Sequence, residues 1–480
     1  MQKNITLLTD LYQLTMMNGY FVSSSHNTMA VFDLFFRAKA EINYGIMAGL
    51  EQAIDYIKNL SFTKDDIKYL KNLKIFDENF LQYLNDFKFS GDVWAVAEGD
   101  VVFPNEPILI VKAPIIEAQL LETALLNIIN HQTLIATKAS KMLQASKGKE
   151  VIEYGLRRAL GPDSGIYGTR ASMIGGCTAT SNVLGGKLFD VAVKGTHGHS
   201  WVLSYPSELE AFKEFAKVYP DSCLLLVDTY DTLNSGVPNA ITVFNELKAK
   251  GHKPLGIRLD SGDLAYLSKM ARTMLDEAGF NDAIIIASND IDEYLISELE
   301  MQGAKIDIYG VGTKLVTASN ISSLGGVYKL TAIERKDKSG KKILEPVMKF
   351  SDSENKSTNP AFKNLYRIYD IKDGKAKADL ITLDGEEISK PLTLTHPIER
   401  WKTTTLEDFI IRPMLNQIFK NGKLVYKVPP LSQTIAFSKK EQNKFWDEYK
   451  RLTRPHLYKV NLSDGLYKLK NEIQIRQKRL

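Results

Sequence analysis

The chain has 480 residues, of which 44% are hydrophobic and 25% are charged, and its formal net charge is +4. This length exceeds the roughly 250–300 residues that one hydrophobic core can serve, so the composition predicts a soluble globular protein with more than one domain. The small net charge argues against a nucleic-acid-binding or membrane-surface protein, and Cys177 and Cys223 alone exclude a disulfide framework. With no long apolar run and no signal peptide, the sequence predicts a cytoplasmic protein.

The first 136 residues mix helical and extended patterns, which predicts an α+β segment. In chain order, we expect a helix from Thr9-Asp10, a strand over Met29–Phe36, helices through Ile57 and Leu84, strands near Val93–Ala97 and Ile108–Val111, and a long helix over Ile116–Thr137. The long helix then leads into a region with a different sequence pattern.

From residue 137 to 334, short β-branched runs alternate with helical patterns. The runs are Val151–Tyr154, Leu188–Val193, Leu224–Val227, Leu255–Leu259, Ala283–Ala287, Ile306–Tyr309 and Val327–Thr331. Continuously apolar strands that alternate with helices are typical of a buried parallel sheet. The helix predicted over Ser268–Gly279 shows the intervening pattern, with Gly279 suited to a C-terminal cap. So many units in so few residues favour a closed or nearly closed α/β barrel.

Residues 335–480 have a third kind of sequence pattern, in which signals for β-hairpins dominate. Asp373-Gly374, Asp384-Gly385 and Asn421-Gly422 each lie between β-rich runs, and Pro429-Pro430 precedes a final helical segment. Such dipeptides are strong signals for tight hairpin turns, so we expect an antiparallel β region here.

Polar residues follow the predicted barrel strands, where barrel enzymes carry their catalytic groups. They include Arg157, Asp228, Asp231, Arg258, Asp260, Asp263 and Asp290. One such aspartate would usually be a helix N-cap, but the set predicts one site. Its carboxylates suit ribose hydroxyls and water around Mg²⁺, and its arginines suit phosphate or carboxylate oxygens.

Two loops add to this predicted site. Gly310-Val311-Gly312-Thr313 follows a late strand, where a glycine turn can hold a phosphate with backbone N–H groups. The segment Gly195–Ser200 contains His197 and His199, and a neutral imidazole there can act as a nucleophile toward a phosphoryl group. We predict no protein metal site, because nothing completes a zinc-ligand set.

Several long motifs resemble the nicotinate phosphoribosyltransferase family, in the family's order from residue 9 to about 330. They are Thr9–Met16, Glu117–Thr123, Gly155–Ala159, Gly195–Ser200, Ile257–Leu264 and Tyr309–Thr313. The resemblance implies an irregular α/β barrel plus an α+β domain built from N-terminal and C-terminal segments. It also implies a homodimer that joins nicotinate to phosphoribosyl diphosphate, with ATP and Mg²⁺, in the salvage branch of NAD biosynthesis.

The resemblance also implies roles for single residues. His199 matches the autophosphorylated histidine, although His197 is a second imidazole in the same motif. The substrate contacts implied are Thr196 and Arg258 for nicotinate, Tyr12 of a neighbouring subunit for the pyridine ring, Gly310, Gly312 and Thr313 for the 5′-phosphate, and Asp228, Asp260 and Arg157 for ribose, diphosphate or ring.

Three alternatives remain open from the sequence. Nicotinamide or quinolinate phosphoribosyltransferases are similar enzymes, and nicotinamide relatives tend to carry an aspartate where this chain has Ser181. A silent scaffold barrel is a second reading. An unrelated aldolase-like barrel is a third, and it would need Lys194 or Lys314 as a Schiff-base lysine.

Overall fold

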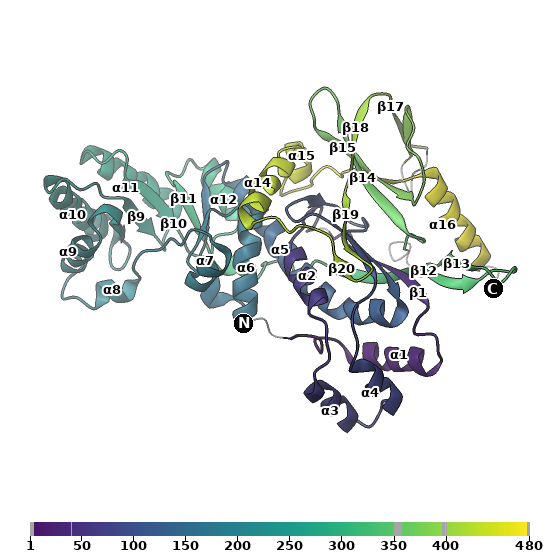
Figure 1. Cartoon of the computed structure of the whole chain (residues 1–480). Helices are drawn as coiled ribbons and strands as arrows, with labels where there is room; N and C mark the ends of the chain where they lie inside the picture. Colours follow the sequence, from purple (N-terminus) through teal and green to yellow (C-terminus); the bar gives the residue numbers. More distant parts are fainter. Residues whose placement is uncertain (1–3, 40, 350–357, 396–398, 400, 478–480) are drawn as a thin grey trace. The chain divides into compact units, whose positions relative to one another are not determined.

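The computed structural model describes residues 4–39, 41–349, 358–395, 399 and 401–477. Its internal contacts divide the chain into two compact units (Figure 1). The terminal unit comprises Met1–Leu134 and Ser323–Leu480, and the barrel unit comprises Ile135–Ser322.

The barrel unit is built on a six-stranded parallel sheet, which forms a half barrel. Its strands, in spatial order, are β7 (Ala179–Thr180), β6 (Glu150–Glu153), β11 (Ile308–Val311), β10 (Ile284–Ala287), β9 (Gly256–Leu259) and β8 (Leu224–Leu226). In the described part of the chain, the edge strands β7 and β8 do not pair with each other. The prediction of an irregular α/β barrel is therefore confirmed, with an open rather than a closed sheet.

Helices connect these strands. They are η1 (Leu156–Arg158), α6 (Pro162–Gly175), α7 (Val183–Phe189), α8 (His199–Leu203), α9 (Glu208–Val218), η2 (Pro220–Ser222), η3 (Thr232–Gly236), α10 (Val237–Ala249), α11 (Leu264–Glu277), α12 (Glu293–Met301) and α13 (Thr313–Val316). The predicted helix near Ser268–Gly279 is confirmed as α11, and Gly279 follows it at φ +78° as a glycine stop.

Two of the predicted barrel strands are wrong. Leu188 lies in α7, which begins after the Asn182 side chain accepts a hydrogen bond from the Gly185 N–H, and only Val193 forms a bridge, with Thr180. Val327–Thr331 lies in β12 of the terminal unit and pairs antiparallel with β1. Apolar β-branched runs look alike in both sheets, so periodicity could not assign this strand.

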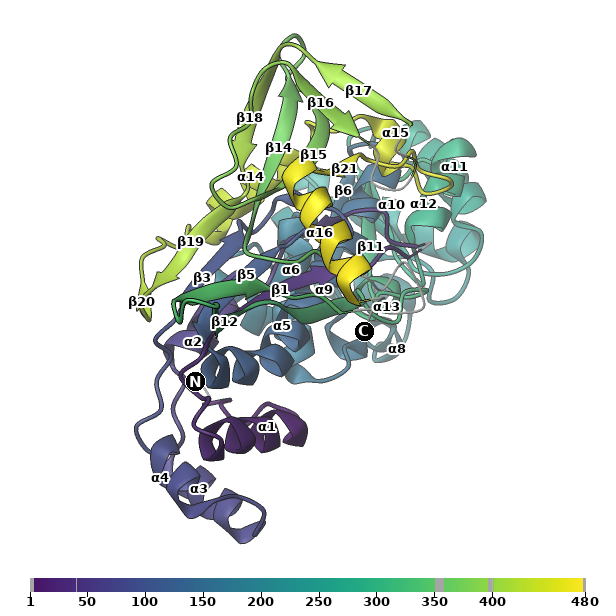
Figure 2. The ribbon, with the colours of Figure 1, turned by 90° about the vertical axis from the view of Figure 1, so that its right-hand side faces the viewer.

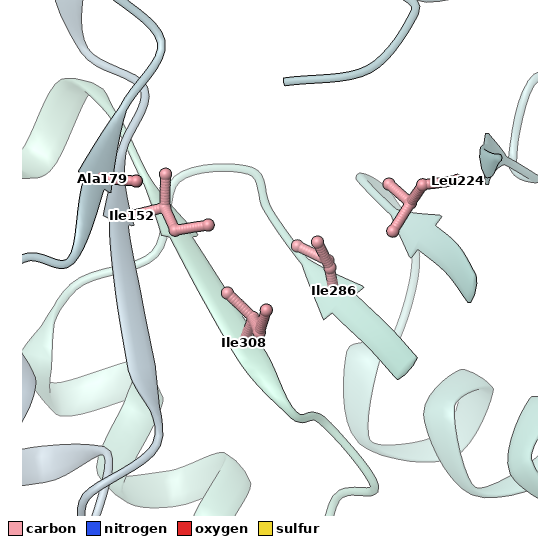
Figure 3. Packing of buried hydrophobic residues seen from close by; sticks show 5 residues of the cluster. All are labelled: Ile152, Ala179, Leu224, Ile286 and Ile308. Carbon is pink, nitrogen blue, oxygen red and sulfur yellow. The ribbon is translucent and has the colours of Figure 1, made fainter. Parts of the chain in front are cut away.

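A hydrophobic core fills the inner side of the half barrel. It comprises Ile152, Ala179, Leu224, Ile286 and Ile308 (Figure 3). Tyr154 and Ile284 are partly buried and pack against it. Each strand of the sheet except β9 contributes to this cluster or its margin, so the core holds the strand ends in register.

The terminal unit contains a seven-stranded antiparallel sheet. In spatial order its strands are β13 (Lys342–Pro346), β12 (Gly326–Lys336), β1 (Met29–Phe36), β5 (Leu109–Pro114), β3 (Asp92–Val96), β19 (Leu415–Lys420) and β20 (Lys423–Leu424). The N-terminal helices are α1 (Leu11–Val22), α2 (Leu50–Lys58), α3 (Lys64–Asn72), α4 (Glu78–Leu84) and α5 (Ile115–Ala145), and β2 (Gly45–Ile46) pairs with β4 (Val101–Val102). The expected N-terminal elements are confirmed, but the long helix α5 continues to Ala145, well beyond its predicted end at Thr137.

The C-terminal part of this unit adds a second, smaller sheet (Figure 2). Its strands are β18 (Phe409–Pro413), β14 (Lys363–Asp370), β15 (Ala376–Leu383) and β21 (Val460–Leu462), beside a separate pair β16 (Leu392–Thr395) and β17 (Thr403–Leu406) and helices α14 (Leu431–Gln442), α15 (Asp447–Lys450) and α16 (Asp464–Gln477). The hairpins at Asp373-Gly374 and Asn421-Gly422 are confirmed. The hairpin at Asp384-Gly385 is wrong, because the free edge of β15 pairs with β21 instead.

A buried ionic network ties this second sheet to the N-terminal segment of the terminal unit. The fully buried Arg367 guanidinium lies 2.8 Å from the Asp100 carboxylate and 2.6 Å from Asp379. Arg412 also binds Asp100, at 2.8 Å, and Glu441, at 3.2 Å. Five acidic and basic side chains from distant parts of the chain thus share one cluster, with Asp100 and Arg367 fully buried within it.

Glu106 completes this network as a buried carboxyl group beside Asp379. Its Oε2 accepts a hydrogen bond of 2.8 Å from the Phe103 N–H. Burial first, and then the Asp379 carboxylate, raise the pKa of Glu106 well above its usual value. Arg367 opposes this rise but does not reverse it. Glu106 therefore holds a proton in the folded state at pH values where an exposed glutamate has lost it.

We expect Glu106→Gln to flatten the pH dependence of stability. A raised folded-state pKa makes the glutamate contribution fully present below the unfolded pKa, and this contribution is lost as pH rises through the folded pKa. Glutamine can still donate toward Asp379 and cannot ionise. Urea unfolding from pH 5 to 9 should show wild type losing stability relative to the variant as pH rises; parallel curves would contradict a protonated Glu106.

Candidate active site

Parallel pairing aligns side chains in layers on the inner face of the half barrel. One layer, defined by the strand register, contains Leu226, Arg258, Ile286 and Ile308. Side chains repeat on the same face every second residue, so the next layer lies just beyond the strand ends. This layer, which we call the mouth layer, contains Asp228, Asp260, Ser288 and Gly310.

Asp228 joins the ends of β8 and β9 within the mouth layer. Its Oδ2 accepts hydrogen bonds from the Asp260 N–H, at 2.8 Å, and from the Ser261 hydroxyl, at 2.6 Å. The residue is 8% exposed, and its buried Oδ1 has no hydrogen-bond partner in the structure. A buried carboxylate oxygen without a donor is costly, so this atom is suited to a substrate hydroxyl or a cation-bound water.

Asp260 lies between Ser288 and His199. The Ser288 hydroxyl donates to Asp260 Oδ1, while Asp260 Oδ2 lies 3.7 Å from His199 Nε2. The other ring nitrogen, Nδ1, lies 3.1 Å from the Thr229 hydroxyl oxygen. His199 starts helix α8 and remains 40% exposed at its side chain. Its imidazole is thus both oriented by two strand ends and open to a ligand.

His197 differs from His199 in every respect that matters for reactivity. It is buried, its ring packs against Phe215 at 4.7 Å between centroids, and its Nε2 accepts the Leu226 N–H at 3.3 Å. Burial, with smaller effects from Arg258 and His199, lowers the pKa of His197 to about 4. A neutral ring whose acceptor nitrogen is engaged by the backbone holds the loop in position and has no nitrogen available for a phosphoryl group.

Arg258 and Tyr154 line the inner face next to the mouth layer. Burial raises the pKa of Tyr154, and Arg258 is close enough to oppose this rise. A Cβ at Gly310 would lie 2.6 Å from the Tyr154 ring, so only glycine leaves room for the aromatic face. The buried Arg258 Nε has no hydrogen-bond partner in the structure. An aromatic face and an available guanidinium edge suit a small ring that carries a carboxylate.

The turn that carries Arg157 packs directly on the glycine turn after β11. A Cβ at Gly155 would lie 2.7 Å from Val316 Cβ and 2.9 Å from the Gly312 carbonyl oxygen. The buried Glu153 carboxylate accepts the Gly155 N–H and the hydroxyls of Thr169 and Thr180 in addition. Exposed Arg157 therefore lies on a fixed turn beside Gly312 and Thr313.

Other predicted residues have local roles. Thr196 donates its hydroxyl to the Leu224 carbonyl, which anchors the histidine loop. Asp231 accepts the N–H groups of Leu233 and Asn234 as the cap of η3, and Asp263 caps α11 through the Tyr266 N–H. The helix-cap interpretation thus accounts for Asp231 and Asp263, and the shared site consists of the mouth layer with its neighbours.

Tyr12 belongs to the terminal unit. It is 48% exposed on α1, and burial, with Glu122 and Asp10, raises its pKa. Glu122 also lies 3.9 Å from Lys329, and the pKa of Lys329 is lowered by burial and by the nearby Arg37 and Lys349. Arg37 and Lys349 thus lie close enough to Lys329 to disfavour its charged form, while Glu122 favours it.

Sequence reasoning did not assign Tyr154, Thr229 or Ser288 to the site. Tyr154 precedes the arginine turn, and Thr229 and Ser288 adjoin mouth aspartates, so a rule that reads each strand end as a unit would have found them.

The described residues contain neither a cluster of metal ligands nor a membrane-spanning helix. No group of three or more His, Cys, Asp or Glu side chains among them is arranged to hold a metal ion. Within the same residues, no helix has both the length and the apolar character needed to cross a membrane.

Comparison with known proteins gives a consistent result along the whole chain. Residues 7–130 match the model of the nicotinate phosphoribosyltransferase N-terminal domain, 150–373 match the nicotinate phosphoribosyltransferase family model, and 362–470 match the C-terminal domain model. The Bacillus subtilis nicotinate phosphoribosyltransferase is 45% identical over 467 residues, which is 97% of this chain and 94% of the relative. The Caenorhabditis elegans nicotinate phosphoribosyltransferase is 36% identical, over 96% of this chain and 92% of the relative.

Solved structures agree with these relatives. The crystal structure of human nicotinic acid phosphoribosyltransferase superposes with a TM-score of 0.84 at 28% identity and covers 97% of this chain and 99% of that chain. The nicotinate-nucleotide pyrophosphorylase of Pyrococcus furiosus has a TM-score of 0.69 at 21% identity, covering 92% and 96% of the two chains, and shows a shared fold.

Proposed function

Because the chain belongs to the nicotinate phosphoribosyltransferase family, we propose that it joins nicotinate to phosphoribosyl diphosphate, releasing diphosphate, in an ATP-coupled step of NAD salvage. The observation that carries this proposal is the mouth layer. Asp228 and Asp260 of this layer lie next to His199 and to Arg258 of the preceding layer, and Asp228 Oδ1 and Arg258 Nε have no hydrogen-bond partner in the structure. Such a set is suited to a charged ribosyl substrate and a small carboxylate ring.

Nicotinate is proposed to lie against Tyr154 with its carboxylate on Arg258. Arginine matches a carboxylate with two parallel hydrogen bonds, and the Arg258 Nε is available for one of them. Thr196, which the family resemblance assigns to nicotinate, lies in the adjoining loop, which its hydroxyl anchors to the Leu224 carbonyl. Tyr12 of a second subunit would cover the other ring face, worth about 0.5–1.5 kcal/mol beyond area burial.

Phosphoribosyl diphosphate is proposed to span the remaining groups. The Asp228 Oδ1 and Asp260 Oδ2 atoms suit ribose hydroxyls, and the turn of Gly310, Gly312 and Thr313 suits the 5′-phosphate. Arg157 lies on the packed turn beside it and would bind diphosphate oxygens. The carboxylates of Asp228 and Asp260 suit water bound to Mg²⁺, and such an ion, carried by the diphosphate, would neutralise part of its charge.

The chemistry follows from alignment more than from covalent assistance. The pyridine nitrogen attacks C1 of the ribose as the C1–O bond to diphosphate breaks, and positive charge develops on the ribose. Asp228 and Asp260 are held by backbone and serine donors, so their charge is preorganised on that side of the sugar. Fixed charge and a near-attack geometry are the largest sources of catalysis in such a reaction.

His199 is proposed to accept the γ-phosphoryl group of ATP. It is the exposed histidine of its loop, held by Thr229 and near Asp260. A phosphoryl group there would add about −1.5 to −2 charge next to the diphosphate position, by analogy with other phosphorylated side chains. This charge would alter substrate affinity and so couple ATP hydrolysis to product formation.

We expect His199→Ala to lose ATPase activity and ATP stimulation while retaining slow transfer. The substrate contacts on β8, β9 and β11 do not depend on the imidazole, so basal synthesis of nicotinate mononucleotide should survive. Assays with nicotinate, phosphoribosyl diphosphate and Mg²⁺, with and without ATP, measure both activities. Peptide mapping of the phosphorylated enzyme should locate the phosphoryl group on His199. A phosphoryl group on His197, or full ATP stimulation of the variant, would remove His199 from the mechanism.

A homodimer is part of the proposal. In the described barrel unit, apolar side chains are exposed on the turn after β6 and on α7, including Leu160 at 81% and Val183 at 72%. Leu11 and Tyr12 are also exposed on α1 of the terminal unit. Exposed apolar surface of this kind favours association with a second copy. Sedimentation that yields only the monomer mass at assay concentration would contradict it. We also propose that the protein is cytoplasmic, as its sequence predicts.

An assay distinguishes nicotinate from the rival substrates nicotinamide and quinolinate. Ser181 follows β7 with its N–H bonded to the Glu153 carbonyl, and it brings no carboxylate that would favour an amide. We expect nicotinate to be used and nicotinamide and quinolinate to be poor substrates in the same reaction. Lys194 does not suit the aldolase reading, because it forms an ion pair with Glu150, at 3.0 Å, at the start of β6, and this leaves that reading with Lys314 as its candidate.

A further inference from the structure

Ser288 is a buried serine in the mouth layer with no assigned role. It directly follows β10 on the inner face of the half barrel and is 4% exposed. Its N–H continues the parallel pairing to the Leu259 carbonyl, at 2.8 Å, which aligns its side chain with that of Asp260. A small hydrophobic residue would fill this space equally well. A buried hydroxyl is costly unless it forms a hydrogen bond, so its presence here points to a specific hydrogen-bond partner.

That hydroxyl has one proton and two possible acceptors. Asp260 Oδ1 is the closer one, and the Leu259 carbonyl oxygen is at 3.4 Å. A bond to an ionised carboxylate is the stronger of the two, so the proton points to Asp260. With Oδ1 engaged in this way, the carboxylate cannot rotate freely, and Oδ2 is left facing His199 Nε2 at 3.7 Å.

The backbone of Asp260 is fixed separately. Its N–H donates to Asp228 Oδ2, which also accepts the Ser261 hydroxyl. Asp228 therefore sets where residue 260 lies, but no contact from Asp228 orients the Asp260 carboxylate. In the described structure, Ser288 is the protein hydroxyl that bonds to this carboxylate.

We propose that Ser288 is a positioning residue of the reaction, which holds the Asp260 carboxylate with one oxygen toward His199 and the bound ribosyl substrate. This inference rests on the proposed function of the same site. Ser288 acts through Asp260 and does not itself contact the reacting atoms. Its contribution should vanish when Asp260 is absent, which a purely structural role would not predict.

The test compares Ser288→Ala with a matched serine deletion in the same unit. Ser268 is also fully buried, and its hydroxyl donates to the Ala265 carbonyl and accepts the Lys305 N–H, away from the mouth layer. We expect Ser288→Ala to lower kcat/KM for phosphoribosyl diphosphate by about 10- to 100-fold, the range for losing a hydrogen bond to a charged group. Ser268→Ala should retain the wild-type value, with thermal unfolding used to compare the stability of both variants.

A double-mutant cycle decides whether the effect passes through Asp260. In an Asp260→Ala background, adding Ser288→Ala should change kcat/KM, or the Kd for phosphoribosyl diphosphate where turnover is too slow, by less than about twofold. A full independent loss in that background overturns the proposal, as does wild-type activity in Ser288→Ala. If Ser288→Ala does not fold, Ser288→Cys keeps the volume with a weak donor and should show the same pattern.

Failure of this inference is distinguishable from failure of the proposed function. Wild-type protein that makes no nicotinate mononucleotide contradicts the function, whatever the variants do. Active wild type with an active Ser288→Ala variant contradicts only the role of Ser288.

Discussion

Arg258→Met should lower kcat/KM for nicotinate by about 100- to 1,000-fold, the range for losing two charge-assisted hydrogen bonds in a water-poor site. Arg258 lies on the inner face of β9, in register with Leu226 and Ile286, and its Nε is buried without a partner. A methionine keeps most of the volume and removes the only group in this layer that matches a carboxylate. Steady-state kinetics with varied nicotinate measures the effect.

Arg258→Lys is the matched control, because it keeps the positive charge and loses the planar fork. We expect an intermediate value, since an ammonium group attracts the carboxylate but cannot bind both oxygens in one plane. Equal kinetics for wild type and the methionine variant would show that the nicotinate carboxylate binds elsewhere.

Arg367→Met should reduce the free energy of unfolding by about 3–5 kcal/mol, the cost of removing one partner from a buried ion pair. Arg367 is fully buried between Asp100 and Asp379, at 2.8 and 2.6 Å. It also donates to the Val101 carbonyl at 2.7 Å. Without it, the Asp379 carboxylate would be left beside Glu106 with no cation to balance it. Urea unfolding of the variant measures the loss.

The same substitution at the surface provides the comparison. Arg335 pairs with Glu345 at 3.2 Å in the terminal unit, and its side chain is 57% exposed. Arg335→Met should cost no more than about 1 kcal/mol, because solvent screens an exposed pair. Similar urea midpoints for the two variants would mean that the Arg367 network is solvated or replaceable.

Features that depend on residues close in sequence were predictable. Asp10 precedes α1, Gly279 follows α11, and the turns at Asp373-Gly374 and Asn421-Gly422 join paired strands, as expected. The order of strand ends carrying Asp228, Arg258 and Asp260 was also readable, because a parallel sheet brings its carboxyl ends to one edge whatever its exact closure. Local backbone preferences and periodicity are properties of the sequence itself.

Pairing partners and protonation states were decided only in the folded chain. Val327–Thr331 has the composition of a barrel strand, yet it pairs antiparallel with β1, some 300 residues away in sequence. Arg367 reaches Asp100 across 267 positions. His197 and His199 are chemically identical in sequence, and only burial against Phe215 and the Leu226 N–H keeps one neutral while the other stays exposed beside Asp260. Long-range contacts set these outcomes, since desolvation and charge pairing depend on which surfaces meet in space.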